Sequence, residues 1–168
     1  FWPLDARPEE VDIEDIAQGL SRMSRFYGAT LGTVGYTVAQ HSVLASEVVQ
    51  PEYRLHALMH DAAEAYVGDV ITPLKRLLGF TYMNIEDGIL AAVSEAYGFV
   101  WTPEAEVAVK KVDRQMLATE VRDLLPHKVV RIDPGEAPVP GLSIEPWDQE
   151  TAKRKFLLRF EVLKGGTP

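Results

Sequence analysis

Four residues that can bind a metal ion stand on three separate stretches of the chain. His60 and Asp61 are adjacent, His41 lies upstream within Gln-His-Ser, and Asp113 lies downstream among apolar residues. An aspartate within an apolar helix needs a partner, because an unpaired buried carboxylate is costly. Two neutral imidazoles and two carboxylates carry two negative charges, which balance a divalent cation. We therefore predict that His41, His60, Asp61 and Asp113 hold one divalent metal ion.

The sequence around these positions predicts helices and almost no strand-like alternation. Capping residues, prolines and apolar spacing place helix starts at or near Asp12, Thr37, Pro51, Tyr82, Thr102 and Trp147. The helix from Pro51 is expected to continue to Gly68, and segment 127–146 is rich in Pro and Gly, which predicts a loop with room for a short hairpin near 128–145. The predicted fold class is therefore all-α, with the metal site between helices.

Composition indicates a single soluble domain. The 168 residues are 46% hydrophobic and 25% charged, which is ordinary for a globular protein. No apolar run approaches the ~20 residues that span a bilayer, and no secretory signal pattern opens the chain, so we expect no membrane partner and a cytoplasmic location. The lack of cysteine excludes thiolate ligands and a cysteine nucleophile. A net charge of −8 argues against a nucleic-acid partner.

The order of the metal-binding residues resembles a known superfamily of enzymes. The pattern H…HD…D on three helices is similar to that of the HD-domain phosphohydrolases. From His60 to Lys75 the sequence reads HDAAEAYVGDVITPLK, which resembles the HD-x-x-E-x-x-x-G-D-x-x-(T)-P-x-K stretch of the YfbR-like branch. That branch includes 5'-deoxynucleotidases and phage deoxynucleoside-triphosphate hydrolases. The resemblance implies a single HD domain over 1–168, with a core over about 12–125 and a C-terminal loop and helix over 126–168.

The resemblance also implies roles for two acidic residues. Glu64 would position or deprotonate the attacking water, and its place four residues after His60 puts both on one helix face. The alternative for Glu64 is a surface helix glutamate. Asp69 would assist proton transfer to the leaving oxygen, and the alternative is a turn residue after Gly68.

Substrate phosphates need positive charge beside the metal. The family places a phosphate-binding arginine near the end of the first helix, where Arg22 and Arg25 stand, and the choice between them stays open. Thr72 and Lys75 are further candidates for substrate binding, because they follow the metal-binding segment in a Thr-Pro-Leu-Lys turn. A lysine in solvent is the alternative for Lys75.

The expected function is metal-dependent hydrolysis of a nucleotide phosphoester, of the 5'-deoxynucleotidase or deoxynucleoside triphosphate triphosphohydrolase type. Mixed nitrogen and oxygen ligands suit Mn, Co, Fe, Ni or Zn. One ion is expected rather than two, because the chain has 4 histidines, and His56 and His127 have no evident role. Two alternatives remain: a non-catalytic HD module that binds a nucleotide or a regulatory partner, and a purely structural metal site. We also expect a homo-oligomer, because helices 82–97 and 147–163 offer apolar stripes beyond what the core needs.

Overall fold

The computed structural model describes residues 1–126 and 132–165, and this part of the chain is all-α, as predicted. Its helices are, in chain order, η1 (Pro8–Glu10), α1 (Ile13–Arg22), η2 (Arg25–Gly28), α2 (Val38–Val48), η3 (Pro51–Tyr53), α3 (Arg54–Met59), α4 (Glu64–Val67), α5 (Thr72–Leu78), α6 (Phe80–Ala96), α7 (Pro103–Leu124) and α8 (Gln149–Leu163). Within the described ranges there is no strand, and the single isolated bridge joins Ser24 to Thr37.

Side-chain caps fix where the main helices begin. The side chains of Asp12, Thr37, Thr102 and Asp148 each accept a hydrogen bond from a backbone N–H in the first turn of α1, α2, α7 and α8. Such caps satisfy N–H groups that the helix leaves unpaired. The predicted starts of α1, α2 and α7 are confirmed, and α8 begins two residues after Trp147.

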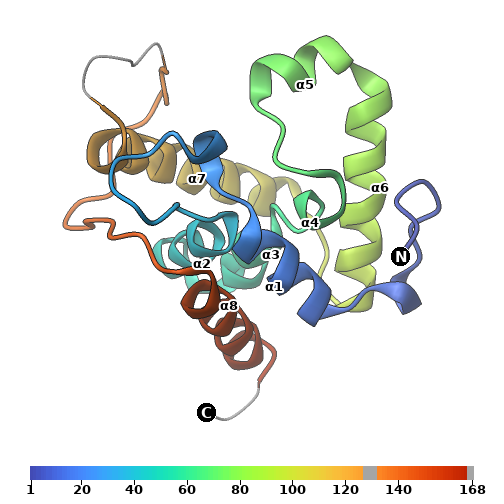
Figure 1. Ribbon diagram of the computed structural model, residues 1–168. Helices are drawn as coiled ribbons and strands as arrows, with labels where there is room; N and C mark the ends of the chain where they lie inside the picture. Colours follow the sequence, from blue (N-terminus) through green and yellow to red (C-terminus); the bar gives the residue numbers. More distant parts are fainter. Residues whose placement is uncertain (127–131, 166–168) are drawn as a thin grey trace.

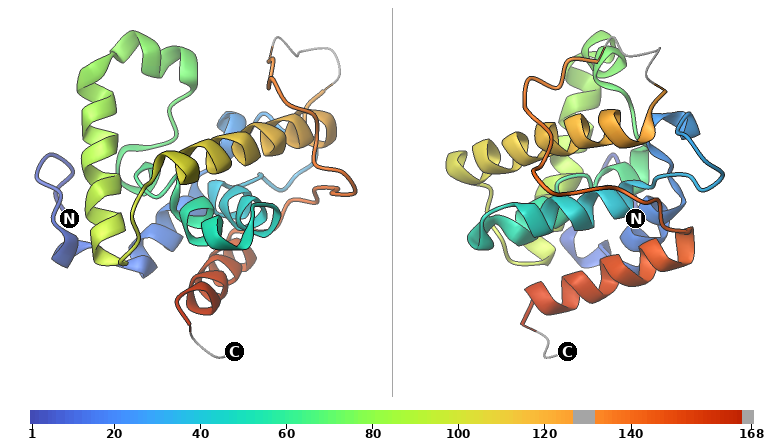
Figure 2. Two further views of the ribbon diagram at one scale, coloured as in Figure 1. Left: turned by 180° about the vertical axis from the view of Figure 1, so that it is seen from behind. Right: turned by 90° about the vertical axis from the view of Figure 1, so that its left-hand side faces the viewer.

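The helix α2 runs through the centre of the molecule between two apolar clusters (Figure 1). Residues 38–46 are buried on every side, which fits a helix surrounded by other elements. One cluster gathers side chains from α1, α3, α6 and α8, and the other gathers side chains from α7 and the segment before α8. Figure 2 shows α7 and α8 on opposite sides of α2. The polar residue His41 of α2 is therefore buried in the interior.

The helix predicted from Pro51 to Gly68 is not continuous, and the break falls at the pair His60 and Asp61. Helix α3 ends at Met59, α4 begins at Glu64, and residues 60–63 form a turn. The N–H of Glu64 donates to the carbonyl of Asp61 at 3.0 Å, a three-residue span that is tighter than an α-helical turn. The prediction of one helix was wrong here, because its pattern of apolar residues is the same for both kinds of turn.

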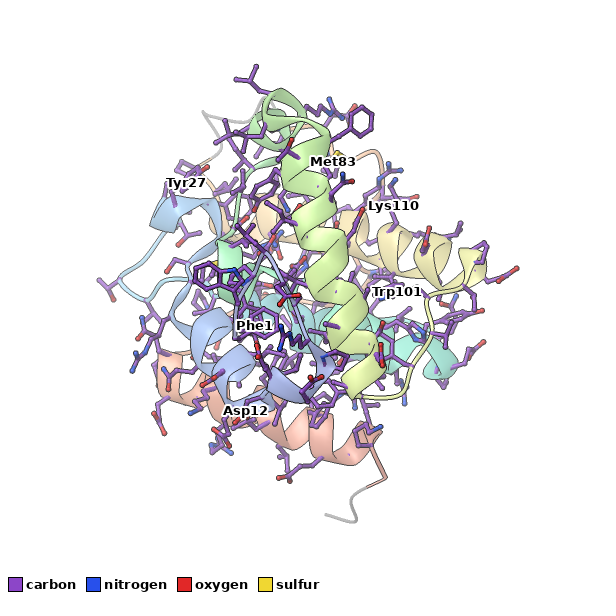
Figure 3. All side chains as sticks on the ribbon, turned by 90° about the vertical axis from the view of Figure 1, so that its right-hand side faces the viewer. Phe1, Asp12, Tyr27, Met83, Trp101 and Lys110 are labelled. Atoms are coloured by element: carbon purple, nitrogen blue, oxygen red, sulfur yellow. The ribbon has the colours of Figure 1, made fainter. Side chains whose placement is uncertain are left out.

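Helix α5 and the N-terminal part of α6 form an arm that stands away from the rest of the molecule (Figure 1), whereas Ile89 and Val93 further along α6 are buried in an apolar cluster. Large apolar side chains are exposed on it: Leu77 is 82% and Phe80 81% exposed, and Met83 points outward from α6 in Figure 3. None of the described helices is long and apolar enough to cross a membrane.

The segment before α8 is a loop where the structure describes it. Residues 132–145 contain no strand, so that part confirms a loop and gives no support to a hairpin near 128–145. Val129 and Val130, on which the hairpin was predicted, lie outside the described residues.

Gly19 provides a test of how α1 positions α4. A Cβ atom on Gly19 would lie 2.9 Å from the Cβ and 3.0 Å from the Cα of Ala65 in α4, whereas a Cβ on Gly88 in α6 would meet nothing within 4 Å. Gly19→Ala should lower the free energy of unfolding by about 1–3 kcal/mol through overpacking. Gly88→Ala should raise it by about 0.5–1 kcal/mol through helix propensity. Urea unfolding of both variants measures this, and equal stability of the two would contradict the close α1–α4 contact.

Candidate metal centre

Helices α2 and α7 and the turn after α3 bring two imidazoles and two carboxylates together. The Nε2 atoms of His41 and His60 lie 3.3 Å apart. Asp61 places Oδ1 3.3 Å from His60 Nε2 and Oδ2 3.7 Å from His41 Nε2. Asp113 places Oδ1 3.2 Å from His41 Nε2 and 3.9 Å from His60 Nε2. All four residues predicted as metal ligands therefore converge.

The donor atoms of this cluster fit a divalent metal ion. One donor atom each from His41, His60 and Asp61 lies within 4.8 Å of the other two. Asp113 is not part of this set of three, but its Oδ1 lies 3.2 and 3.9 Å from the two Nε2 atoms. Among the described residues, Asp61 Oδ2 is buried and has no hydrogen-bond partner. Two facing imidazole nitrogens and a carboxylate oxygen without a hydrogen bond are groups that a cation would satisfy together.

Hydrogen bonds to the far side of each ring direct Nε2 toward the common point. His60 Nδ1 lies 2.8 Å from the carbonyl oxygen of Ala57, which can only accept, so Nδ1 carries the proton. His41 Nδ1 lies 2.5 Å from Oε1 of Glu120, an acceptor when ionised. In the neutral form of each ring the proton is therefore on Nδ1, and the Nε2 lone pair is the one that a metal could bind.

Neighbouring charges set the protonation of the cluster. Burial and Arg25 lower the pKa of His41, but Glu120 and Asp113 outweigh them, and the pKa is raised. Burial also lowers the pKa of His60, whereas Asp61 and Asp113 raise it to about 9. Burial acts to raise the pKa of Asp113, but the two histidines hold it well below its usual value. A metal ion would therefore compete with protons for the two Nε2 atoms.

Glu120 is a residue of this centre that was not predicted from the sequence. It is fully buried in α7, and its Oε2 accepts hydrogen bonds from Arg25 Nε at 3.2 Å and Arg25 Nη2 at 3.1 Å. Despite burial, Arg25 and His41 lower the pKa of Glu120, so it is a carboxylate. The signal was its place seven residues after Asp113, two turns along the same helix face.

Glu64 is buried and lies close enough to Asp61 for that carboxylate to affect its pKa. Its Oε1 lies 3.4 Å from Lys75 Nζ, and its Oε2 is buried without a hydrogen-bond partner in the described part of the chain. Burial, together with Asp61 and Asp69, raises the pKa of Glu64 to about 9. Glu64 is 6% exposed, so the alternative of a surface helix glutamate was wrong.

Asp69 follows Gly68, which ends α4 with φ 87°. Burial and the nearby Asp61 raise the pKa of Asp69 against the opposing effect of Arg25. Asp69 therefore lies within electrostatic reach of the centre, as its predicted role requires.

The two candidate arginines differ in their surroundings. Arg25 is largely buried, and its Nη1 lies 3.7 Å from Asp61 Oδ2, whereas Arg22 is exposed at the end of α1. The backbone after Arg25 is strained, because Phe26 and Tyr27 both have φ 54°. Tyr27 lies at the edge of the molecule (Figure 3). The contacts favour Arg25 as the arginine next to the centre.

Helix α5 brings Lys75 to the site. Lys75 Nζ lies 2.8 Å from Oε1 of Glu86 as well as 3.4 Å from Oε1 of Glu64. It is therefore held between two carboxylates rather than free in solvent. Thr72 begins α5, and its side chain lies outside the described part of the structure.

His56 stands apart from the cluster. Its Nε2 lies 3.0 Å from the carbonyl oxygen of Val100, and its ring meets those of Phe99 and Trp101 edge-on. His56 therefore has a packing role. His127 lies outside the described residues.

Fold and site define an all-helical protein with a candidate His/Asp metal centre. No protein-family model matches the chain. The chain is 33% identical over 174 residues to an uncharacterised protein of Rhodobacter capsulatus, covering 95% of this chain and 89% of that protein. It is 47% identical over 124 residues to the uncharacterised protein YfdR of Escherichia coli K12, covering 74% and 67%. The chain belongs to the family of these two proteins.

Removing one ligand tests the centre. His60→Ala and Asp113→Ala should each lose the bound divalent ion. Their melting temperatures should also fall, because metal binding and folding are coupled. The matched control is His56→Gln, which removes a histidine four residues from His60 and retains a donor for the Val100 carbonyl. Elemental analysis and thermal unfolding measure both quantities. Wild-type metal content in His60→Ala and Asp113→Ala would contradict the assignment.

Proposed function

We propose that this protein is a metal-dependent phosphohydrolase that acts on nucleotides, with the HD-domain fold. The observation that carries the proposal is the convergence of His41, His60, Asp61 and Asp113 with a buried acid, Glu64, beside them. The resemblance of segment 60–75 to the YfbR-like branch supports the substrate class. A purely structural metal site needs only its ligands, whereas this site has the buried carboxyl group of Glu64 in addition to them.

A single divalent ion, of Mn, Co, Fe, Ni or Zn, would be held by the two Nε2 atoms and the two carboxylates. When bound, it would lower the pKa of a nearby water molecule and polarise a phosphoryl oxygen.

Glu64 would orient the attacking water and accept its proton. Burial and the neighbouring carboxylates disfavour its ionised form, and a divalent charge beside Asp61 would offset that repulsion. Asp69 would hold a proton for the leaving oxygen, because burial raises its pKa. Glu64 would then act on the attacking water and Asp69 on the leaving oxygen.

Two cations would neutralise the substrate phosphate. Arg25 has Nη1 directed toward Asp61, and Lys75 reaches Glu64, so both cations flank the two acidic groups. Arg22, exposed at the end of α1, and Thr72, at the start of α5, stay predictions as further contacts.

A panel of nucleotides tests the proposal. Nucleoside monophosphates and deoxynucleoside triphosphates are incubated with the protein and Mn²⁺ or Co²⁺, and products are separated by chromatography. Hydrolysis of a monophosphate releases a nucleoside and phosphate, whereas triphosphohydrolysis releases a deoxynucleoside and triphosphate. Binding of a nucleotide without any product would support the alternative, a non-catalytic HD module, and would overturn the proposed activity.

Glu64→Gln separates catalysis from metal binding. It retains the shape of the side chain and removes the carboxylate, so kcat should fall by about 10²–10⁴-fold, as for loss of a general base. Metal content and nucleotide binding should stay at wild-type levels, because His41, His60, Asp61 and Asp113 form the ligand set. The control is Glu95→Gln, an exposed glutamate on α6. Loss of the ion would make Glu64 a ligand, and unchanged turnover would remove it from the mechanism.

The charge of the chain and the composition of its surface support proposals about the remaining partners. The net charge of −8 and the absence of cysteine support a small nucleotide rather than a nucleic acid as partner, in a cytoplasmic location. Exposed apolar side chains on the α5–α6 arm and at Leu158 and Val162 of α8 support a homo-oligomer. Light scattering at micromolar concentration should give a mass above that of one chain, and a monomeric mass would contradict it.

A further inference from the structure

Glu120 is a carboxylate in the interior, and both of its oxygens are occupied by groups of the candidate centre. It is 0% exposed. Its Oε1 lies 2.5 Å from His41 Nδ1, and its Oε2 accepts from two nitrogens of Arg25 at 3.1 and 3.2 Å. Taking a carboxylate out of water is costly unless it is paired and hydrogen-bonded. These contacts satisfy that requirement, and they also constrain both partners.

The contact with His41 fixes which ring nitrogen carries the proton. An ionised carboxylate is an acceptor, so Nδ1 must be the donor. The Nε2 lone pair then faces His60 Nε2 at 3.3 Å and the carboxylates of Asp61 and Asp113. Because His41 is also 0% exposed, no solvent molecule at the surface of the protein competes for this arrangement.

The contact with Arg25 fixes the direction of its guanidinium group. Nε and Nη2 both donate to Oε2 of Glu120, which leaves Nη1 on the side of the centre, 3.7 Å from Asp61 Oδ2. The backbone N–H of Arg25 also donates to the carbonyl of Tyr36 at 2.9 Å, so the base of the side chain is held as well. The carboxylate of Glu120 therefore fixes both the tautomer of His41 and the direction of the guanidinium group of Arg25.

We propose that Glu120 is a positioning residue that holds His41 in its metal-binding tautomer and aims Arg25 at the substrate phosphate. The part concerning Arg25 rests on the proposed function, and the part concerning His41 does not. The competing explanation is a structural ion pair with Arg25, in which the contact with His41 has no consequence.

Glu120→Gln distinguishes the two explanations. Glutamine has one acceptor oxygen and one NH₂ group, and Arg25 is always charged, so the oxygen should face Arg25 and the NH₂ should face His41. His41 Nδ1 then becomes the acceptor and the proton moves to Nε2, which can no longer bind a metal. The affinity for Co²⁺ should fall by about 10–100-fold, as for loss of such partners elsewhere.

Two further variants complete the comparison. Arg25→Lys retains the charge and breaks the two-nitrogen contact, so it should leave the Co²⁺ affinity close to wild type and weaken binding of inorganic phosphate to the Co²⁺-loaded protein. Glu106→Gln makes the same chemical change on an exposed site of α7 and should alter neither quantity.

The measurements are titration with Co²⁺ alone, followed by its absorption spectrum, and ¹⁵N NMR of labelled histidines. Wild-type His41 should show a protonated Nδ1, and Glu120→Gln a protonated Nε2. The wild-type spectrum, recorded at a pH at which the ring of His41 is neutral, tests the proposal even where the variant does not fold, since a neutral ring protonated on Nε2 would overturn it. Equal loss of Co²⁺ affinity in Glu120→Gln and Arg25→Lys would also overturn it, in favour of the structural ion pair. Neither readout needs hydrolysis, so an inactive protein would refute the proposed function and leave the part of this proposal that concerns His41 intact.

Discussion

The contact between the buried imidazole of His41 and the buried carboxylate of Glu120 is the interaction on which the candidate site depends. It joins the N-terminal part of α2 to α7 between the two apolar clusters. A charged group at such a place is tolerated because its partner is there too. The apolar packing of α2 buries His41 in the interior. Glu120 then orients the ring of His41, so that Nε2 faces His60 and the two aspartates.

A second constraint is the accumulation of negative charge around that contact. Asp61 and Asp69 contribute to the raised pKa of Glu64, and Asp61 contributes to the raised pKa of Asp69. Arg25 and Lys75 oppose this repulsion from either side. A cation among the carboxylates would favour their ionised forms, and the break between α3 and α4 places Asp61 and Glu64 where one cation would act on both.

Local signals in the sequence predicted much of the fold and the residues that gather at the candidate centre. Caps at Asp12, Thr37 and Thr102 gave the helix starts, because capping is a property of adjacent residues. The order H…HD…D gave residues that the structure brings together. The turn after α3 and the role of Glu120 were missed, because the first depends on how α1 packs on α4, and the second is a contact across 79 residues of chain. The seven-residue spacing from Asp113, which places Glu120 on the same face of α7, was the feature of the sequence that could have indicated its role.

The central claim is that His41, His60, Asp61 and Asp113 hold one divalent ion. Anomalous diffraction from crystals grown with Co²⁺, with data at the cobalt edge, tests it most directly. If the four residues hold the ion, a single strong peak should lie about 2.0–2.2 Å from His41 Nε2, from His60 Nε2 and from an oxygen of each carboxylate. The absence of a peak at that position, or a peak bound by other residues, would contradict the account.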